Sequence, residues 1–356
     1  MENITHTLVG ATLARAGLSK KAPLAAPALL LAANLPDIDI FGWLIGQNYL
    51  DFHRGITHAV AGSVALSAGQ AAVFHGINLW RARKSPLRPS FCWMWVVCLA
   101  GILSNPALDF LNDFGLRPWM PFDGRWYYGD LLGITDPWVW IVFGSALFVG
   151  TCSRRGQAGW LALGVLMLMF LSVSRGIAFA ALWTAVLLTA VAVGRLVRRR
   201  GLNEALAALG LFAAYVAALL AVRESVAMRA RESVPGLIAG KIEKIEVLPG
   251  RPAAPHRWMV VVESSDSYHI ADVGLRDWRT HTPSFERFEK NLDDDCYRAS
   301  LSQQEIAALA RFARFPSASV EASGDSCIVW LRDLRYARKN EPTWGTARAT
   351  LPHPSP

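Results

Sequence analysis

The stretch GIAFAALWTAVLLTAVAVG, residues 176–194, decides the class of fold. It contains no charged residue, and the ~30 Å hydrocarbon core of a bilayer needs roughly 20 helical residues to cross it. Shorter stretches at about 4–18 and 22–34 are either half-inserted helices or short spans within a bundle. Further apolar runs lie at about 56–80, 91–104, 137–152, 158–173 and 204–222. The sequence therefore predicts an all-α polytopic membrane helix bundle of about seven to eight helices.

Charge is divided unevenly along the 356 residues. Residues 1–222 contain 27 charged side chains, whereas the 134 residues that follow contain 37. This contrast excludes a single soluble globule and a disordered chain. It also argues against a nucleic-acid partner, because the excess positive charge lies between apolar runs. The sequence predicts a membrane-embedded metal-site domain over 1–222, a linker at 223–235, a small α+β domain at 236–341 and a flexible tail at 342–356.

The loops between the apolar runs predict an orientation. Twelve Lys and Arg residues fall in one set of alternate loops and four in the other. Because positive loops stay in the cytoplasm, the acidic loops and the C-terminal domain are expected outside it. The basic loops contain Lys20, Lys21, Arg81, Arg83, Lys84, Arg88, Arg154, Arg155, Arg195, Arg198, Arg199 and Arg200.

Unusual polar residues follow or precede the apolar runs, all on the predicted outer face. Ionisable groups at membrane depth are costly and are functional candidates by default. Imidazoles and carboxylates together suit zinc, manganese or iron, and one or two such ions can polarise a phosphoryl or acyl oxygen and activate water. The residues concerned are His6, Asp37, Asp39, His53, His58, Asn105, Asp109 and Asp113.

Two pairs dominate this set. Asp37 and Asp39 follow Pro36, so an extended turn can aim both carboxylates into one pocket; the alternative is a simple Asx turn at a helix end. His53 and His58 are five residues apart across a Gly-containing junction between a loop and a helix. They are either ligands of a metal ion or residues of the membrane interface.

The third segment is predicted to begin a helix. Asn105 before Pro106 is typical of an N-cap followed by proline at the first helical position. Asn105, Asp109 and Asp113 would then lie on one helical face, unless Asn105 is only a cap. Asp130 is expected to be solvated in a loop.

At these motifs the chain resembles the YdjM-like family of bacterial inner-membrane metal-dependent hydrolases. The resemblance rests on the opening THTLVG, on NLPDID, on HRGITH and on the stretch PFDGRWYYGD followed by DPW. It implies a hydrolase of the inner membrane that acts on a lipid or other phosphoester-like small molecule, with zinc as the first choice of metal and manganese or magnesium as alternatives. Together with the orientation that the loop charges predict, an inner-membrane location places the C-terminal domain in the periplasm. The metal-site positions implied by the resemblance are His6, Asp37, Asp39, His53, His58 and Asp109. The catalytic candidates are Asp37, Asp39, His58 and Arg54. Arg54 would neutralise negative charge that develops during the reaction.

One position departs from the family. Members often have His-Pro-x-x-Asp where this chain has Asn105-Pro106-Ala-Leu-Asp109. Asparagine ligates hard cations through its carbonyl oxygen but is a poor zinc ligand. The departure indicates either a single metal ion or an altered activity.

The sequence of the C-terminal part predicts a small α+β domain. Strands are expected at 241–248, 257–263 and 267–272, with a hairpin over 317–321 and 327–333. Ser302-Gln-Gln-Glu305 predicts a capping box that begins a helix. A disulfide between Cys296 and Cys327 is compatible with an oxidising compartment. His281 is expected on the surface.

A function of a different class remains open on the sequence alone. The same buried charges would serve a non-enzymatic membrane protein, either a transporter or a stress-response scaffold. A transporter favours polar residues through the middle of several spans, and the centres of 158–173, 176–194 and 204–222 are almost free of them. The hydrolase is therefore the leading hypothesis.

Overall fold

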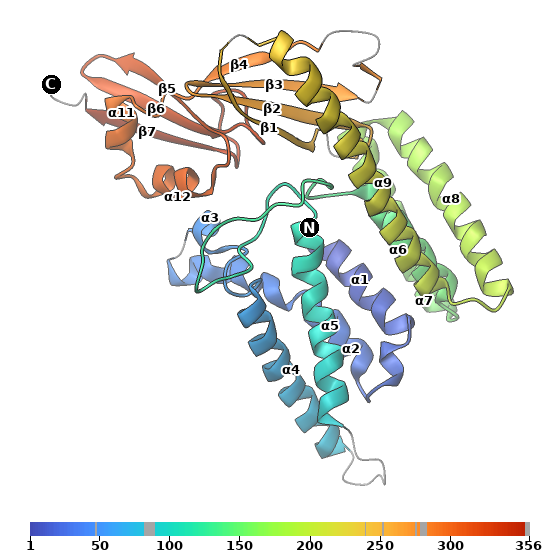
Figure 1. Ribbon diagram of the computed structural model, residues 1–356. Helices are drawn as coiled ribbons and strands as arrows, with labels where there is room; N and C mark the ends of the chain where they lie inside the picture. Colours follow the sequence, from blue (N-terminus) through green and yellow to red (C-terminus); the bar gives the residue numbers. More distant parts are fainter. Residues whose placement is uncertain are drawn as a thin grey trace. The chain divides into compact units, whose positions relative to one another are not determined.

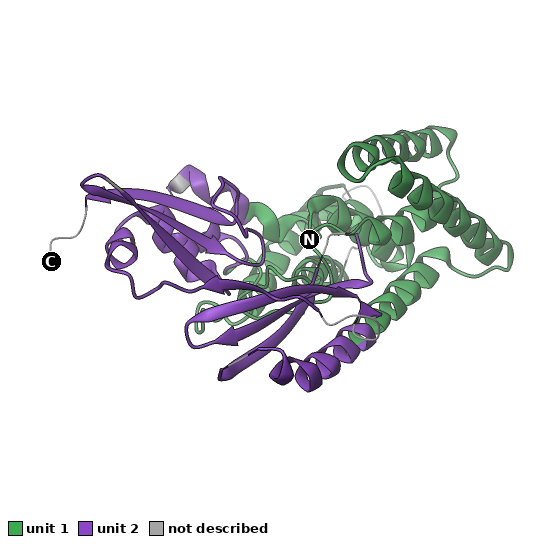
Figure 2. Ribbon diagram, turned by 90° about the horizontal axis from the view of Figure 1, so that it is seen from above, with its two compact units in different colours: residues 1–38, 56–220 green, residues 39–55, 221–356 purple. Residues whose placement is uncertain are grey.

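The computed structural model describes residues 1–46, 48–81, 90–238, 240–250, 253–274, 276–277 and 283–352. The chain divides into two units, which Figure 2 shows in different colours: residues 1–38 with 56–220, and residues 39–55 with 221–356. Arg83, Lys84 and Arg88, assigned above to a cytoplasmic loop, and His281 lie outside the described residues.

The first unit is built from helices, which can be followed in Figure 1 from blue to yellow-green. α9 continues into the second unit. The elements are α1 Asn3–Arg15, η1 Leu18–Lys20, α2 Ala25–Ala32, α4 Val60–Arg81, α5 Phe91–Phe110, α6 Pro137–Gly150, α7 Arg154–Arg175, α8 Ile177–Arg199 and α9 Glu204–Ser233.

Five of the described helices, α4, α5, α7, α8 and α9, are long and apolar enough to cross a membrane. The number becomes six if α2 and the 3₁₀ helix η2, Leu35–Ile45, form one span with a bend of 47°. α6, with 14 residues, is a shorter apolar helix. These findings confirm the predicted helical membrane bundle, and they show that the run at 22–34 is the first half of a bent pair.

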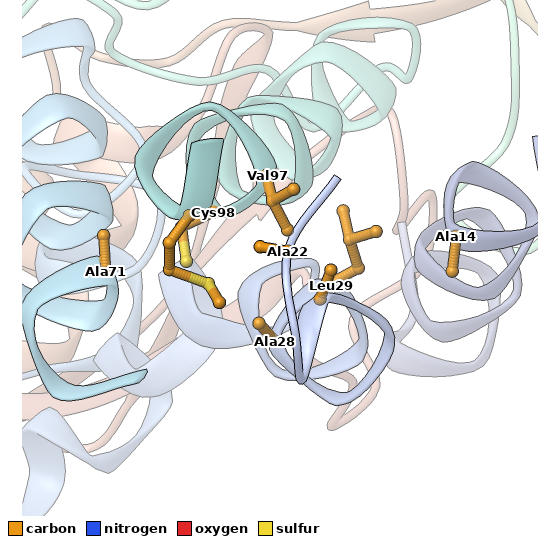
Figure 3. Packing of buried hydrophobic residues seen from close by; sticks show 9 residues of the cluster. Ala14, Ala22, Ala28, Leu29, Ala71, Val97 and Cys98 are labelled. Atoms are coloured by element: carbon orange, nitrogen blue, oxygen red, sulfur yellow. The ribbon is translucent and has the colours of Figure 1, made fainter. Parts of the chain in front are cut away.

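Small residues bring α1, α2, α4 and α5 close together. Figure 3 shows their contact layer, which is made mostly of alanines around Leu29, Val97 and Cys98. A Cβ atom on Gly10 would lie 2.9 Å from the Cβ of Ala33, so α1 and the end of α2 approach at backbone distance. Such small-residue contacts are how helices pack when lipid and protein are equally apolar.

Hydrogen bonds at both ends of α6 connect it to neighbouring helices. At its start, Asp136 caps the helix by accepting from the Trp138 N–H at 2.8 Å and also accepts from the Tyr215 hydroxyl at 3.0 Å. At its end, the carbonyl of Gly150 accepts from Arg15, the last residue of α1. α1 and α6 therefore run in the same direction.

The second unit contains two antiparallel sheets. β1 Ile242–Pro249, β2 Arg257–Ser264, β3 Ser267–Gly274 and β4 Glu286–Glu289 pair in sequence order, and β5 Pro316–Ser323, β6 Ser326–Asp333 and β7 Thr346–Pro352 form the second sheet. Two helices, α11 Asp295–Ser300 and α12 Gln304–Phe312, lie between the sheets in sequence. The alternating apolar residues of β2 and β3 fill a core with Phe288, Phe315 and Leu334. This confirms the predicted small α+β domain.

Three expectations for this domain have definite outcomes. Cys296 and Cys327 form a disulfide that joins α11 to β6. The predicted capping box is wrong: Ser302 donates to the carbonyl of Ala299, and α12 begins only at Gln304. The predicted flexible tail is wrong over 346–352, because these residues pair with β6 and Ala347 and Ala349 are buried on it.

A segment from the N-terminal part of the sequence also belongs to the second unit. Residues 39–55 include α3, Tyr49–Phe52, which begins at the N-cap Asn48 and packs against α12. Arg311 of α12 donates two hydrogen bonds to the carboxylate of Asp51, at 2.8 and 2.6 Å. The C-terminal domain therefore holds a loop that precedes α4 in sequence.

Candidate metal centre

Two histidines and two aspartates from four segments of the first unit meet in one buried cluster. His6 comes from α1, Asp37 from the start of η2, His58 from the turn before α4, and Asp109 from the last turn of α5. His6 and Asp109 are fully buried, and Asp37 retains 6% of its accessible surface. The small-residue packing of α1, α2 and α5 brings these helix ends together.

Each imidazole faces both carboxylates. Nε2 of His58 lies 3.3 Å from a carboxylate oxygen of Asp37 and 3.4 Å from one of Asp109. Nε2 of His6 lies 3.5 Å from Asp109 and 3.9 Å from Asp37. One ligand atom from each of His6, Asp37 and Asp109 falls within 4.8 Å of the others. These three donors are thus near enough to share one ion, and His58 lies beside both carboxylates.

Other contacts orient these side chains. The amide nitrogen of Asn3 lies 3.3 Å from Asp37, and the α-amino group of Met1 contacts Asp109. The hydroxyl of Thr57 lies 3.1 Å from Nδ1 of His58. A partner on the second ring nitrogen fixes an imidazole in the orientation that a metal ligand needs. Sequence reasoning missed Asn3, although its place one helical turn before His6 was a signal.

Asn105 takes part in the cluster through its amide nitrogen. This nitrogen donates to the carbonyl of Ala33 at 2.9 Å and to Asp37 at 3.0 Å. The carbonyl oxygen of the same side chain is buried and accepts no hydrogen bond from the described part of the chain. At the position where the family resemblance leads us to expect histidine, this chain therefore has a group that positions a carboxylate.

The predicted helix start at Asn105 is wrong. Asn105 and Pro106 lie inside α5, which runs on to Phe110, so the segment ends a helix instead of beginning one. Proline is tolerated inside membrane helices more readily than in soluble ones. Asn105 and Asp109 still share a face at i and i+4, but Asp113 lies beyond the helix.

Asp39 and His53 pair with each other within the second unit. Nδ1 of His53 lies 2.7 Å from the Asp39 carboxylate, and the imidazole stacks on Tyr49 with ring centroids 4.7 Å apart. The backbone N–H of Arg54 donates to Asp39 at 2.8 Å, and Arg54 adopts a φ of 53°. Non-glycine residues with positive φ cluster at functional sites because the surrounding structure must maintain the strain. The roles of these residues as ligands or catalysts stay predictions.

The remaining acidic candidates lie elsewhere in the first unit. Asp136 caps α6, as described above. The sequence suggested that Asp130 is solvated, but the structure buries it, with 2% of its surface exposed. The reason is that its loop folds back onto the end of α5, where the N–H groups of Leu131 and Leu132 both donate to the carbonyl of Leu111.

The cluster fits a divalent cation. Two imidazole nitrogens and two carboxylates are a complete donor set for tetrahedral zinc, and they also suit manganese. Two carboxylates buried side by side favour positive charge nearby, because buried charges must be paired, and the α-amino group of Met1 supplies one such charge at Asp109. The unpartnered carbonyl of Asn105 adds an acceptor of the kind that hard cations use.

Replacing Asn105 tests its positioning role. We expect Asn105→Leu to retain metal roughly 10–100-fold more weakly, the range seen when outer-shell partners of metal ligands are removed. Competition with a chelating dye measures the affinity. Ser104→Leu, one residue away on the same helix, is the control and should bind as the wild type does. Equal affinities of Asn105→Leu and wild type would contradict the assignment.

Comparisons with known proteins identify the family of the chain. The family model described as YdjM inner membrane protein matches residues 1–179, which contain all the histidines and aspartates of the cluster. The chain is 21% identical over 315 residues to the uncharacterized protein YfhP of Bacillus subtilis strain 168, covering 88% of this chain and 77% of that protein. No solved structure gives a significant match. With half of its length matched by the family model, the chain belongs to the YdjM inner membrane protein family.

Proposed function

We propose that this protein is a membrane-bound, metal-dependent hydrolase that acts on a lipid or another phosphoester-like substrate. The observation that carries the proposal is the convergence of His6, Asp37, His58 and Asp109 from four segments into one buried cluster. Two histidines and two aspartates buried together at the ends of apolar helices are costly to maintain without a function.

These four residues would hold the ion, with zinc as the first choice because two of the donors are imidazoles. When bound, the ion would polarise a phosphoryl or acyl oxygen and lower the pKa of water in the site. Asn105 holds the Asp37 carboxylate in position, and Thr57 orients His58. Because both residues already make these contacts, little reorganisation is needed when substrate arrives.

The substrate class follows from the surroundings of the cluster. Its residues come from helices α1 and α5 and from the turns that flank α2 and α4, all of them apolar along most of their length. A substrate with an apolar part can approach within the bilayer, and its ester group would meet the cluster at the helix ends. This favours membrane lipids over soluble metabolites.

Product formation tests the hydrolase directly. We expect the purified protein, loaded with zinc or manganese and placed in lipid nanodiscs, to release head groups or phosphate from glycerophospholipids, as measured by mass spectrometry. His58→Gln should abolish release. Metal-loaded wild-type protein that hydrolyses neither phospholipids nor simple phosphoesters would overturn the proposal and favour the non-enzymatic alternative.

We further propose that the C-terminal domain lies in the periplasm, as the charge of the loops predicts. The disulfide supports this location, because such bonds persist in oxidising compartments. In cells lysed into denaturant with a thiol-reactive polymer, we expect labelling of Cys92, Cys98 and Cys152 alone. Reduction should add two labels, and it should add none in a variant with both Cys296→Ser and Cys327→Ser. Labelling of all five cysteines without reduction would place the domain in the cytoplasm.

A further inference from the structure

A cavity of about 350 Å³ opens between α1, α6, α7 and α8, within the first unit. It is lined by Ile4 and Leu8 of α1, by residues around Gly144 and Gly164 on α6 and α7, and by α8 from Trp183 to Arg195. The thirteen residues from Trp183 to Arg195 span about 18 Å of helix, at ~1.5 Å for each of the twelve steps between them. The cavity is therefore longer than half of the ~30 Å apolar core of a bilayer.

Among the described residues, the polar side chains of the lining form hydrogen bonds within the protein, with the exception of one arginine. Most of the lining is aliphatic or aromatic. A ligand that fills the cavity would thus meet almost only apolar surface and few hydrogen-bonding groups. The side-chain donors of Ser145, Thr184, Trp140, Trp160 and Trp183 all bond to oxygens of the protein.

Arg195 is the exception, and it lies at one end of the cavity. It is the charged residue of the lining, its guanidinium carbon lies 5.8 Å from the ring centroid of Phe148, and no described residue forms an ion pair with it. Its neighbours differ in this respect: Arg15 and Arg198 share the carboxylate of Glu204. One cation at the end of an apolar cavity is complementary to an anion that carries a hydrocarbon chain.

From this combination we propose that the cavity is a binding site for an anionic membrane phospholipid. One acyl chain lies along α8 between α6 and α7, and the phosphate binds Arg195. α7 and α8 expose most of their apolar surface, so the chain can enter from the bilayer without crossing water. Arg195 belongs to a basic stretch that the charge distribution assigns to the cytoplasmic side, so the lipid comes from the inner leaflet. The site is independent of the metal cluster.

Native mass spectrometry of the intact protein tests the site. The delipidated protein is equilibrated with equal amounts of phosphatidylglycerol and phosphatidylcholine that carry the same acyl chains. We expect one retained lipid per chain, with phosphatidylglycerol favoured about fivefold, the ratio that corresponds to ~1 kcal/mol for one arginine near an anionic head group. Arg195→Gln should retain both lipids equally, whereas Arg199→Gln, outside the cavity lining, should keep the preference.

Filling the cavity tests the position of the acyl chain. A Cβ atom on Gly144 or on Gly164 would meet no atom of another segment within 4 Å, so both positions have room for a side chain to begin. We expect Gly144→Leu to lower lipid retention at least about tenfold, because the new side chain occupies the cavity. Gly159→Leu, which has equal room but lies outside the lining, should retain lipid as wild type does.

If Gly144→Leu elutes as an aggregate, Gly164→Leu replaces it from the facing helix. Retention equal to that of Gly159→Leu in a folded variant would overturn the proposal. So would wild-type protein that retains phosphatidylcholine, a free fatty acid or detergent as strongly as phosphatidylglycerol. Both outcomes leave the metal content of the cluster unaffected, and therefore do not bear on the proposed hydrolase.

Discussion

Purified Asp37→Asn protein is expected to contain less than about a tenth of the metal found in the wild type. Asp37 contacts both histidines of the cluster and accepts from Asn105, so the substitution changes the most connected ligand. Asparagine keeps the size of the side chain but removes its charge, and a neutral amide is a much weaker ligand for zinc or manganese than a carboxylate. Inductively coupled plasma mass spectrometry after gel filtration measures the metal bound per chain.

The matched control is Asp123→Asn. Hydrogen bonds from the backbone N–H and the guanidinium of Arg125 hold the pKa of Asp123 below its usual range, so this carboxyl is also charged at neutral pH. It lies in a loop, and among the described residues its carboxylate bonds to Arg125 and not to the four residues of the cluster, so its loss should leave the metal content unchanged. Equal metal in the Asp37→Asn and wild-type proteins, or no metal in either, would remove the basis of the proposed site.

Gly62→Ala is expected to destabilise the protein strongly and to release the metal. Gly62 lies in the first turn of α4, and a Cβ atom there would overlap the carbonyl oxygen of Ile56. That carbonyl already accepts from the N–H of Ala59, and the turn between them contains His58. A single added methyl group must therefore push the turn away and move the imidazole out of line with Asp37 and Asp109.

The expected loss is about 3 kcal/mol or more, the upper end for overpacking, because backbone atoms cannot rotate away. For a domain of this size it corresponds to a fall in Tm of roughly 6–12 °C. Gly69→Ala on the same helix is the control: its Cβ atom meets nothing within 4 Å, and alanine is the better helix former. If Gly62→Ala has the same Tm as Gly69→Ala and retains its metal, the turn does not position His58.

Much of the cluster could be predicted because membrane proteins make polar residues conspicuous. His6, Asp37, His58 and Asp109 stood at the ends of apolar runs, and alternating loop charges placed those ends together. The contacts between helices could not be predicted, because they depend on where Gly10, Gly62 and other small residues let backbones meet.

The errors have equally physical causes. Asn105-Pro106 matches the pattern of a helix start, but an apolar helix passes through it, because helices in membranes accept proline. The last strand was missed because TARATLP contains two alanines and a proline, which are depleted in strands, and it is ordered by pairing with β6. The separate pairing of His53 with Asp39 has no signature in the spacing of either motif.

The ion pair between Asp51 and Arg311 joins residues that are 260 positions apart in the chain. The family model matches residues 1–179, and α12, against which α3 packs, lies after the matched residues. A protein shortened to its membrane helices would keep Asp39 and His53 but lose the surface that orders the loop between them. Truncation is therefore not a neutral way to simplify this molecule.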